Sequence, residues 1–217
     1  MENKKKEIGI ASEICIWKDK SECGDCQLSE DIFCHPQLKY MLFFALPLLL
    51  AIIPVTLGMA FSSFDPLMKF FFFFGWIAYA FFFFFILESY VICNHCPYYA
   101  NESQRVLHCT IDKGKLKTGK YNPGPTTTAE RFAFAIGALI LIGYPVPFLI
   151  IGGLIIPLIF LIVGAIAWLV SIQLKVCSDC INFACPLNRV SKSIRDEFLK
   201  RNPIIKSAWE EKGYKID

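Results

Sequence analysis

The chemistry of this chain is concentrated in its ten cysteines, a large number for 217 residues. Nine of them form three groups that are built alike, with two cysteines separated by two residues and a third cysteine further along the chain. The groups are Cys23, Cys26 and Cys34; Cys93, Cys96 and Cys109; and Cys177, Cys180 and Cys185; the tenth cysteine is Cys15. A C-x2-C turn lets two thiolates converge on one ion, so three such turns in one small protein indicate metal ligation.

Each of the three histidines adjoins a cysteine. The pairs are Cys34-His35, His95-Cys96 and His108-Cys109. An imidazole beside a thiolate either binds the metal itself or orients a residue that does. All thirteen side chains are therefore candidate metal ligands, and we expect at least one histidine to bind the metal or to contact a thiolate.

Two kinds of metal centre fit these residues. Eight cysteines would ligate two [4Fe–4S] clusters and leave two over, whereas ten cysteines and three histidines suffice for three tetrahedral zinc sites. Unligated redox thiols are a third possibility. The run from Cys177 to Pro186 resembles a shortened form of the cysteine–proline run of bacterial ferredoxins, although the full four-cysteine spacing is absent. That local resemblance implies iron–sulfur clusters.

Two uncharged stretches early in the chain predict a helical hairpin over residues 40–88. No charged residue occurs from Tyr40 to Phe64, which is 25 positions, and the 18 positions between Lys69 and Glu88 are also uncharged. A helix needs about 20 apolar residues to cross the hydrocarbon core of a bilayer. The polar turn between the two stretches contains Pro66, which suits the first turn of the second helix.

A longer uncharged stretch runs from Phe132 to Leu174, which is 43 residues. A single helix of that length would extend about 64 Å, roughly twice the thickness of the hydrocarbon core. The stretch must therefore fold back and form a second hairpin over residues 132–174. Residues 143–147 and the pair Gly152-Gly153 are both candidate turns, and the sequence leaves the choice between them open.

Four crossings place residues 1–39, 89–131 and 175–217 on one side of the membrane. Of the 22 lysines and arginines, 21 lie in these segments, and Lys69 is the exception. The positive-inside rule then predicts a protein of the cytoplasmic membrane with both termini in the cytoplasm. The first segment is too long and too acidic for a signal peptide, so no cleaved signal is expected. Because the cytosol is reducing, ligation or catalysis is favoured over disulfides.

The spans themselves offer little chemistry. They contain no histidine and no cysteine, and their ionisable residues, Lys69 and Glu88, lie at span ends. Haem ligation and a solute pathway within the bilayer are therefore not expected. Five glycines are predicted to allow close helix packing instead: Gly137, Gly143, Gly152, Gly153 and Gly164.

The layout of four spans with a cysteine-rich loop between the second and the third is similar to that of the DHHC palmitoyltransferases. His95-Cys96-Pro97 matches the end of their motif, and the resemblance implies acyl transfer through Cys96. The chain departs from the family at Cys93 and Asn94, which stand where its aspartate and first histidine would be. Cysteines in both terminal segments also lie outside the family pattern.

The segments outside the spans are expected to assemble around the metal. The first 39 residues carry eight acidic and six basic groups and too little apolar material for a core of their own, so a metal site or the neighbouring loops must order them. Trp17 is either their apolar anchor or an interfacial residue. The lysines at positions 113–120 either face anionic lipid headgroups or bind an acidic protein partner.

The last segment is predicted to form two short amphipathic helices. Ser193-x-x-Asp196 resembles a capping box for the first helix. Pro203 begins the second helix, with Ile205 and Trp209 on one face.

These features together predict an all-α integral membrane protein with four transmembrane helices in two hairpins, a small cysteine-rich cytoplasmic metal-binding cap and a helical C-terminal tail. The favoured function is that of an iron–sulfur electron-transfer protein or the membrane-anchor subunit of a redox complex. A zinc-stabilised, non-enzymatic scaffold that docks a protein partner is the alternative, followed by a thiol-based acyltransferase or thiol redox protein. The net charge of +3 does not favour a nucleic-acid partner. No nucleotide-binding glycine loop, Ser/His/Asp arrangement or carboxylate pair is found, so no catalytic residue is assigned.

The orientation predicts how the cysteines react with a membrane-impermeant thiol reagent. In intact cells none of the ten cysteines should be labelled, and several should be labelled in inverted vesicles. Labelling of Cys93 or Cys177 from outside the cell would contradict the orientation and the argument from the reducing compartment.

Overall fold

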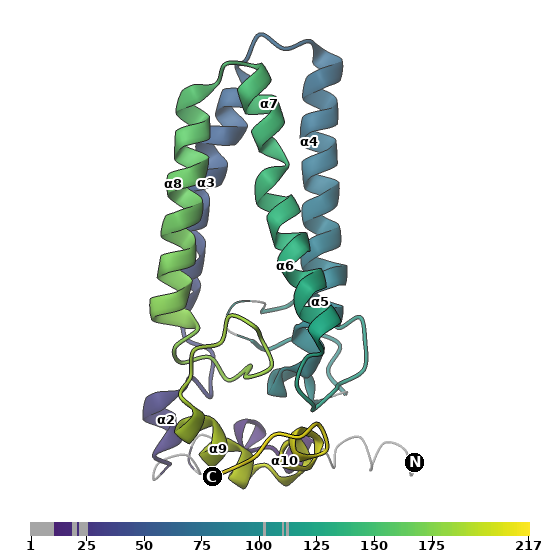
Figure 1. Cartoon of the computed structure of the whole chain (residues 1–217), viewed down its shortest axis with the longest axis vertical. Coiled ribbons are helices and arrows are strands. Elements are labelled where there is room, and N and C mark those ends of the chain that lie inside the picture. Colours follow the sequence, from purple (N-terminus) through teal and green to yellow (C-terminus); the bar gives the residue numbers. More distant parts are fainter. Residues whose placement is uncertain (1–10, 19–20, 22–25, 102, 110, 112) are drawn as a thin grey trace.

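The computed structural model describes residues 11–18, 21, 26–101, 103–109, 111 and 113–217. In these residues the chain is helical apart from loops and a single bridge between Val106 and Leu116. Four long helices stand side by side, and the other described segments lie together beyond one end of them (Figure 1). Residues 11–39, 89–131 and 175–217, in their described parts, therefore share one end of the molecule.

The four long helices are long and apolar enough to cross a membrane, as the sequence predicts. They span Leu38–Ala60, Pro66–His95, Thr128–Ile151 and Ile155–Val176. Within them the helices are α3 (Leu38–Ala60); α4 (Pro66–Phe81), η3 (Phe82–Leu87), α5 (Glu88–Val91) and η4 (Cys93–His95); α6 (Thr128–Gly143) and α7 (Pro145–Ile151); and α8 (Ile155–Ser171) and η6 (Ile172–Val176). Most of the large exposed apolar side chains of the protein lie on these helices. Lipid is the solvent that accepts such a surface.

The turns at the far end of the helices are fixed by local chemistry. The Asp65 carboxylate accepts hydrogen bonds from the backbone amides of Leu67 and Met68, both at 3.0 Å, and Pro66 occupies the first turn of α4. In the long uncharged stretch the helix continues past Gly143, and the chain turns at Gly152-Gly153. Gly153 has a φ of 63°, a conformation that favours glycine. Of the two candidate turns, the second is therefore the one that forms.

The first span packs most closely against the last span and not against its neighbour in sequence. The first span, α3, lies against the last span, α8, while α4 and η3 contact α6 and α7. Gly164 of α8 makes the first contact possible, since a Cβ atom at this position would lie 2.7 Å from the backbone nitrogen of Ala51. Gly137 has the same role against Phe83 and Leu87, whereas the positions of Gly143 and Gly153 are open.

Hydrogen bonds to backbone carbonyls reinforce the same pairs of spans. Trp76 and Tyr79 of α4 donate to the carbonyls of Leu141 and Gly137 of α6, each at 3.1 Å. Ser171 of α8 donates to the carbonyl of Phe43 of α3 at 2.7 Å. These donors would otherwise lack a partner in an apolar environment, so each bond favours one helix arrangement.

Below the spans lie η1 (Cys15–Trp17), α2 (Leu28–Asp31), η5 (Pro97–Tyr99), α9 (Lys192–Arg201) and α10 (Pro203–Glu210). The N-cap of α9 is Ser191, whose hydroxyl accepts from the amide of Ile194 at 3.4 Å, so the capping box predicted at Ser193 is wrong. The predicted partner, Asp196, is buried instead and accepts hydrogen bonds from Lys192 and Tyr214 at 2.7 Å. Helix α10 begins at Pro203 as predicted, and its buried side chains are Ile205 and Trp209.

Close packing between α3 and α8 predicts the effect of enlarging Gly164. Gly164→Leu should force these helices apart and lower the stability of the helical bundle, by about 1–3 kcal/mol if it behaves as an overpacked core. Gly143→Leu is the matched control, because a Cβ atom there meets no atom within 4 Å. Thermal unfolding of the detergent-purified protein measures the difference, and equal stability of the two variants would contradict the packing.

Candidate functional site

One buried cluster beyond the ends of the helices collects residues from all the segments outside the spans, and we call it the cysteine-bearing core. It contains Cys34 and Cys96, with Cys15, Cys26 and Cys109 packed against it. Its apolar side chains are Ile14, Ile16, Leu28, Ile32, Tyr98, Ala100, Ile181, Phe183, Ala184, Val190, Phe198, Leu199, Ile205 and Trp209. The first segment of the chain thus completes its core with residues from the loop after the second span and from the C-terminal tail.

Two of the C-x2-C turns are positioned directly by helix ends. Cys93 lies in η4 at the end of the second span, and Cys177 follows η6 at the end of the fourth. The backbone amide of Cys96 donates to the carbonyl of Cys93 at 2.9 Å, which closes the first turn. The placement of these thiols therefore depends on the packing of the membrane helices.

Four cysteines from three segments act electrostatically on the hydroxyl of Tyr98. Burial raises the pKa of Tyr98, and the charges of Cys109, Cys96, Cys34 and Cys180 raise it further. The hydroxyl donates to the carbonyl of Phe33 at 3.2 Å, and the amide of Phe33 donates to the carbonyl of Asp179 at 2.9 Å. These bonds bring the neighbours Cys34 and Cys180 toward the same ring.

The pKa of the Cys180 thiol responds to several of the same cysteines. Burial raises its pKa well above the usual value, and nearby Cys96, Cys109 and Cys185 raise it further. An unmetallated thiol in this environment is neutral at physiological pH and is a poor nucleophile. A bound cation would reverse that balance by stabilising the thiolate.

A second set of thiols lies closer to the helix ends. Burial raises the pKa of Cys177 to about 11, although the nearby charge of Arg189 lowers it. Burial also raises the pKa of Cys185 to about 12, and the charges of Cys177 and Glu88 raise it further. The Glu88 carboxylate forms an ion pair with Lys115 at 2.8 Å. The same ammonium group donates to the sulfur of Cys93 at 3.6 Å. One ion pair thus connects this set to the C-x2-C turn of the second span.

A third set of thiols lines a pocket of about 310 Å³ at the outer side of the core. Its walls include Cys15, Cys26 and Cys34, together with Lys18 and Arg201. The Arg201 guanidinium donates to the sulfur of Cys26 at 3.0 Å. Cys23, the remaining cysteine of the first group, lies outside the described residues.

The C-terminal tail holds Cys15 in this pocket. Asn202, which separates α9 from α10, accepts from the amide of Cys15 at 2.8 Å and donates to its sulfur at 3.5 Å. Trp17 donates to the carbonyl of Pro97 at 3.1 Å, so the alternative in which it anchors the first segment is the one observed. The N-terminal cysteines are therefore attached both to the tail and to the loop after the second span.

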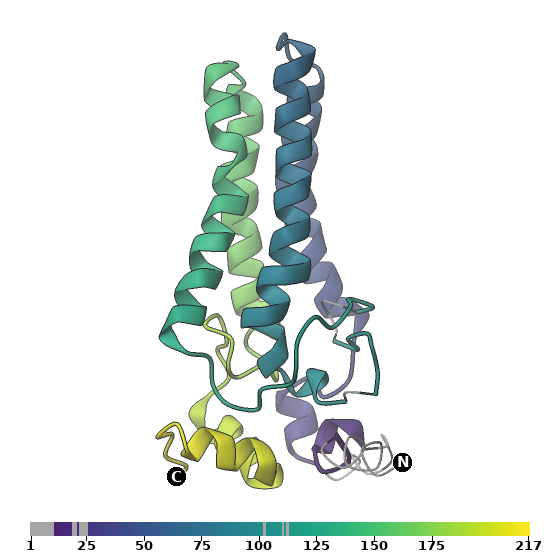
Figure 2. The same cartoon turned by 90° about the vertical axis from the view of Figure 1, so that its right-hand side faces the viewer.

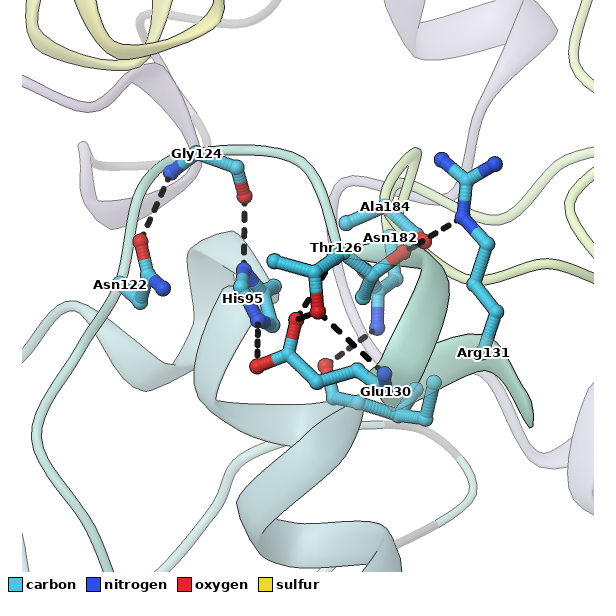
Figure 3. A network of polar contacts seen from close by, with 10 residues as sticks. His95, Asn122, Gly124, Thr126, Glu130, Arg131, Asn182 and Ala184 are labelled. Atoms are coloured by element: carbon cyan, nitrogen blue, oxygen red, sulfur yellow. Dashed lines mark hydrogen bonds and ion pairs between the residues drawn. The ribbon is translucent and has the colours of Figure 1, made fainter. Parts of the chain in front are cut away.

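The three histidines have different surroundings. His95 is fully buried, and its Nδ1 and Nε2 atoms face the Gly124 carbonyl at 2.7 Å and the Glu130 carboxylate at 3.4 Å (Figure 3). His108 is exposed and packs edge-on against Trp17, with 6.4 Å between the ring centres. His35 is half-buried beside Cys34. The ring of His95 is thus held by oxygen atoms rather than directed at a thiol.

His95 belongs to a polar network that joins the end of the second span, the start of α6 and the segment after the fourth span (Figure 3). Glu130 also completes a capping box with Thr127 at the start of α6. Thr126 donates to the carbonyl of Ala184 at 2.6 Å, which connects the loop to the segment after the fourth span. The sequence analysis missed this network, although Thr-x-x-Glu before an apolar run is a recognisable helix start.

Within the described residues, no three His, Cys, Asp or Glu side chains already stand in a geometry that would hold a metal ion. Several buried polar atoms beside the cysteines nevertheless have no hydrogen-bond partner there, among them Asn94 Oδ1, Asn182 Oδ1 and the Tyr121 hydroxyl. Burial raises the pKa of Tyr121, and the charge of Cys96 raises it further. A neutral hydroxyl donor beside a cysteine fits an environment in which sulfur carries negative charge, as in a metal thiolate.

The contacts of His95 predict a structural effect of its replacement. His95→Phe removes the polar contacts of the Gly124 carbonyl and the Glu130 carboxylate with the ring. The loss should lower the free energy of unfolding by about 1–3 kcal/mol per buried group. The loop at residues 103–120 should become more sensitive to protease. His108→Phe, at an exposed position, should change little, and equal sensitivity of the two variants would contradict the assignment.

No family model, curated protein sequence or solved structure matches this chain. Its function must therefore be inferred from the side chains themselves. The features available for that inference are four helices able to span a membrane and a cysteine-bearing core at one end of them.

Proposed function

We propose that this protein is a membrane-anchored electron-transfer protein whose cysteines ligate iron–sulfur clusters. The observation that carries the proposal is that cysteines from all three groups lie in or against buried clusters at one end of the helices. Cys15, Cys26, Cys34, Cys96 and Cys109 belong to the cysteine-bearing core, and Cys177 and Cys180 belong to a second cluster with Phe33, Tyr40, Ile172 and Val176. Such a gathering of thiols beside the span ends suits a path for electrons between a soluble donor and a carrier or partner at the membrane.

The mixing of the sequence groups supports more than one cluster. The charges of Cys96, Cys109 and Cys185 each raise the pKa of Cys180, so cysteines of its own group and of another act on it electrostatically. In two-cluster ferredoxins a cysteine of one local run likewise ligates the other cluster. Two [4Fe–4S] clusters would use eight of the ten cysteines.

The chemistry of the core is suited to cluster assembly. Buried, neutral thiols tolerate the apolar surroundings, and iron would displace their protons on binding. Tyr121 and Asn182 would then lie beside the sulfur ligands, where polar groups tune the reduction potential. The chain's residues supply the thiolates, exclude water and hold three segments together, and the clusters supply one-electron chemistry.

The spans set a limit on this function. The uncharged stretches 40–64, 70–87 and 132–174 contain no histidine or cysteine, so the electrons are proposed to move at the membrane surface and to pass to a partner that carries them further. The positive-inside rule assigns this surface to the cytoplasm. Lys18 and Arg201 at the outer pocket give a soluble, acidic donor a point of approach.

A zinc-stabilised scaffold is the alternative, and the tail favours it. Helices α9 and α10 attach directly to the N-terminal cysteines through Arg201 and Asn202, and Trp209 donates to the carbonyl of Pro123 at 3.1 Å. A structural metal that ties both ends of the chain to one loop would create a rigid docking surface.

Metal content and colour distinguish the two functions. We expect protein purified without oxygen to be brown, to bleach on reduction and to contain roughly eight iron atoms per chain if two cubane clusters are present. Zinc is redox-silent, so a colourless protein with about two or three zinc atoms would replace electron transfer by the scaffold. A protein with neither metal would contradict both functions.

Replacement of Cys96 or Cys180 by serine tests the ligands. Each change should lower the metal content and loosen the cysteine-bearing core to protease, because a structural metal contributes folding energy directly. The membrane helices should still insert. Ser178→Ala, in the same turn as Cys180, is the control, and full metal content in both cysteine variants would show that these thiols are not ligands.

A further inference from the structure

The loop at residues 103–120 encloses a second, basic pocket, separate from the cysteines. The two arms of the loop pair through the bridge between Val106 and Leu116, and the amide of Lys117 donates to the carbonyl of Arg105 at 3.0 Å. Between this hairpin and Tyr99 lies a pocket of about 490 Å³. Its lining includes Arg105, Leu116, Lys117 and Lys120.

The charge of this pocket is positive. The ammonium group of Lys117 is held at its inner side by the carbonyls of Tyr99 and Asn101, at 3.1 Å and 2.6 Å. Arg105 and Lys120 are exposed, and neither forms an ion pair with any residue that the structure describes. The sequence of the loop contains one acidic residue, Asp112, which lies outside the described part.

The pocket lies at the level where the second span leaves the apolar region. Tyr90 is 62% exposed and stands two residues beyond Glu88, about 3 Å along the helix axis. A Cβ atom at Gly119 of the pocket would lie 3.7 Å from the ring of Tyr90. Figure 2 shows this loop beside the lower ends of the long helices. Leu116 is 59% exposed on the same loop.

We propose that this pocket binds the phosphate headgroup of an anionic phospholipid. Arg105 offers the planar donor pair that suits a phosphate, and Lys120 adds a second positive charge. Leu116 and Tyr90 rest at the boundary between headgroups and acyl chains, where an exposed leucine and an interfacial tyrosine are stable. An acidic polypeptide would match the charge but would leave Leu116 in water, so lipid is the occupant that fits both features.

Binding to the purified full-length protein tests this site independently of any metal. Native mass spectrometry in detergent would compare dioleoylphosphatidylglycerol with dioleoylphosphatidylcholine. We expect the anionic lipid to bind more tightly to the wild type. In the double variant Arg105→Gln/Lys120→Gln its affinity should fall roughly 25-fold, about fivefold per charge.

The control is Lys200→Gln/Lys212→Gln, which removes the same charge from exposed positions on the C-terminal tail and should leave the affinity within about twofold. Circular dichroism and size-exclusion profiles that match the wild type establish that the variants fold. An equal loss in both double variants, or equal binding of the two lipids, would overturn the proposal. Preferential binding of inorganic phosphate or of polyglutamate through Arg105 and Lys120 would also overturn it, in favour of a small-anion site or a protein-docking site.

Discussion

The direct attachment of cysteine turns to the ends of long helices is the constraint on which the rest of the structure depends. The second span ends in the turn that begins at Cys93, and the fourth span ends immediately before Cys177. These turns have no freedom to move apart unless the helices do. Helix packing, of α3 against α8 and of α4 against α6, therefore positions the ends of the spans from which these turns extend.

Burial of the thiols then determines their chemistry. The pKa of Cys180, Cys177 and Cys185 is raised chiefly by removal from water. Neutral buried thiols are neither good nucleophiles nor costly to bury, and they become ligands when a metal replaces their protons. The contacts of His95 disfavour acyl transfer through Cys96, the activity implied by the resemblance to the DHHC family, because both ring nitrogens face oxygen atoms of Gly124 and Glu130.

The parts of the structure that depend on local composition could be predicted from the sequence. The uncharged stretches identify four helices, and Pro66 and Pro203 identify helix starts. The choice of Gly152-Gly153 over residues 143–147 could not be made, because both contain turn residues. The start of α9 at Ser191 was missed because the burial of Asp196 by Lys192 and Tyr214 is a tertiary effect.

Interactions between cysteines of different groups could not be predicted from the sequence either. Spacing groups Cys177, Cys180 and Cys185 together, whereas in the fold the charges of Cys96 and Cys109, which belong to another group, also raise the pKa of Cys180. The network of His95 arises in the same way, since Gly124 and Glu130 lie 29 and 35 residues further along the chain. The identity of the metal, the orientation in the membrane and the partner remain predictions that follow from residue chemistry.

The central claim is that cysteines distant in sequence share one centre. Electron paramagnetic resonance of the reduced protein tests it most directly, by comparison of the single variants Cys34→Ser and Cys180→Ser. Both variants should lose the same cluster signal, since the hydrogen bond from the Phe33 amide to the Asp179 carbonyl joins the chain beside Cys34 to the chain beside Cys180. Loss of different signals by the two variants, or retention of every signal in both, would contradict the account.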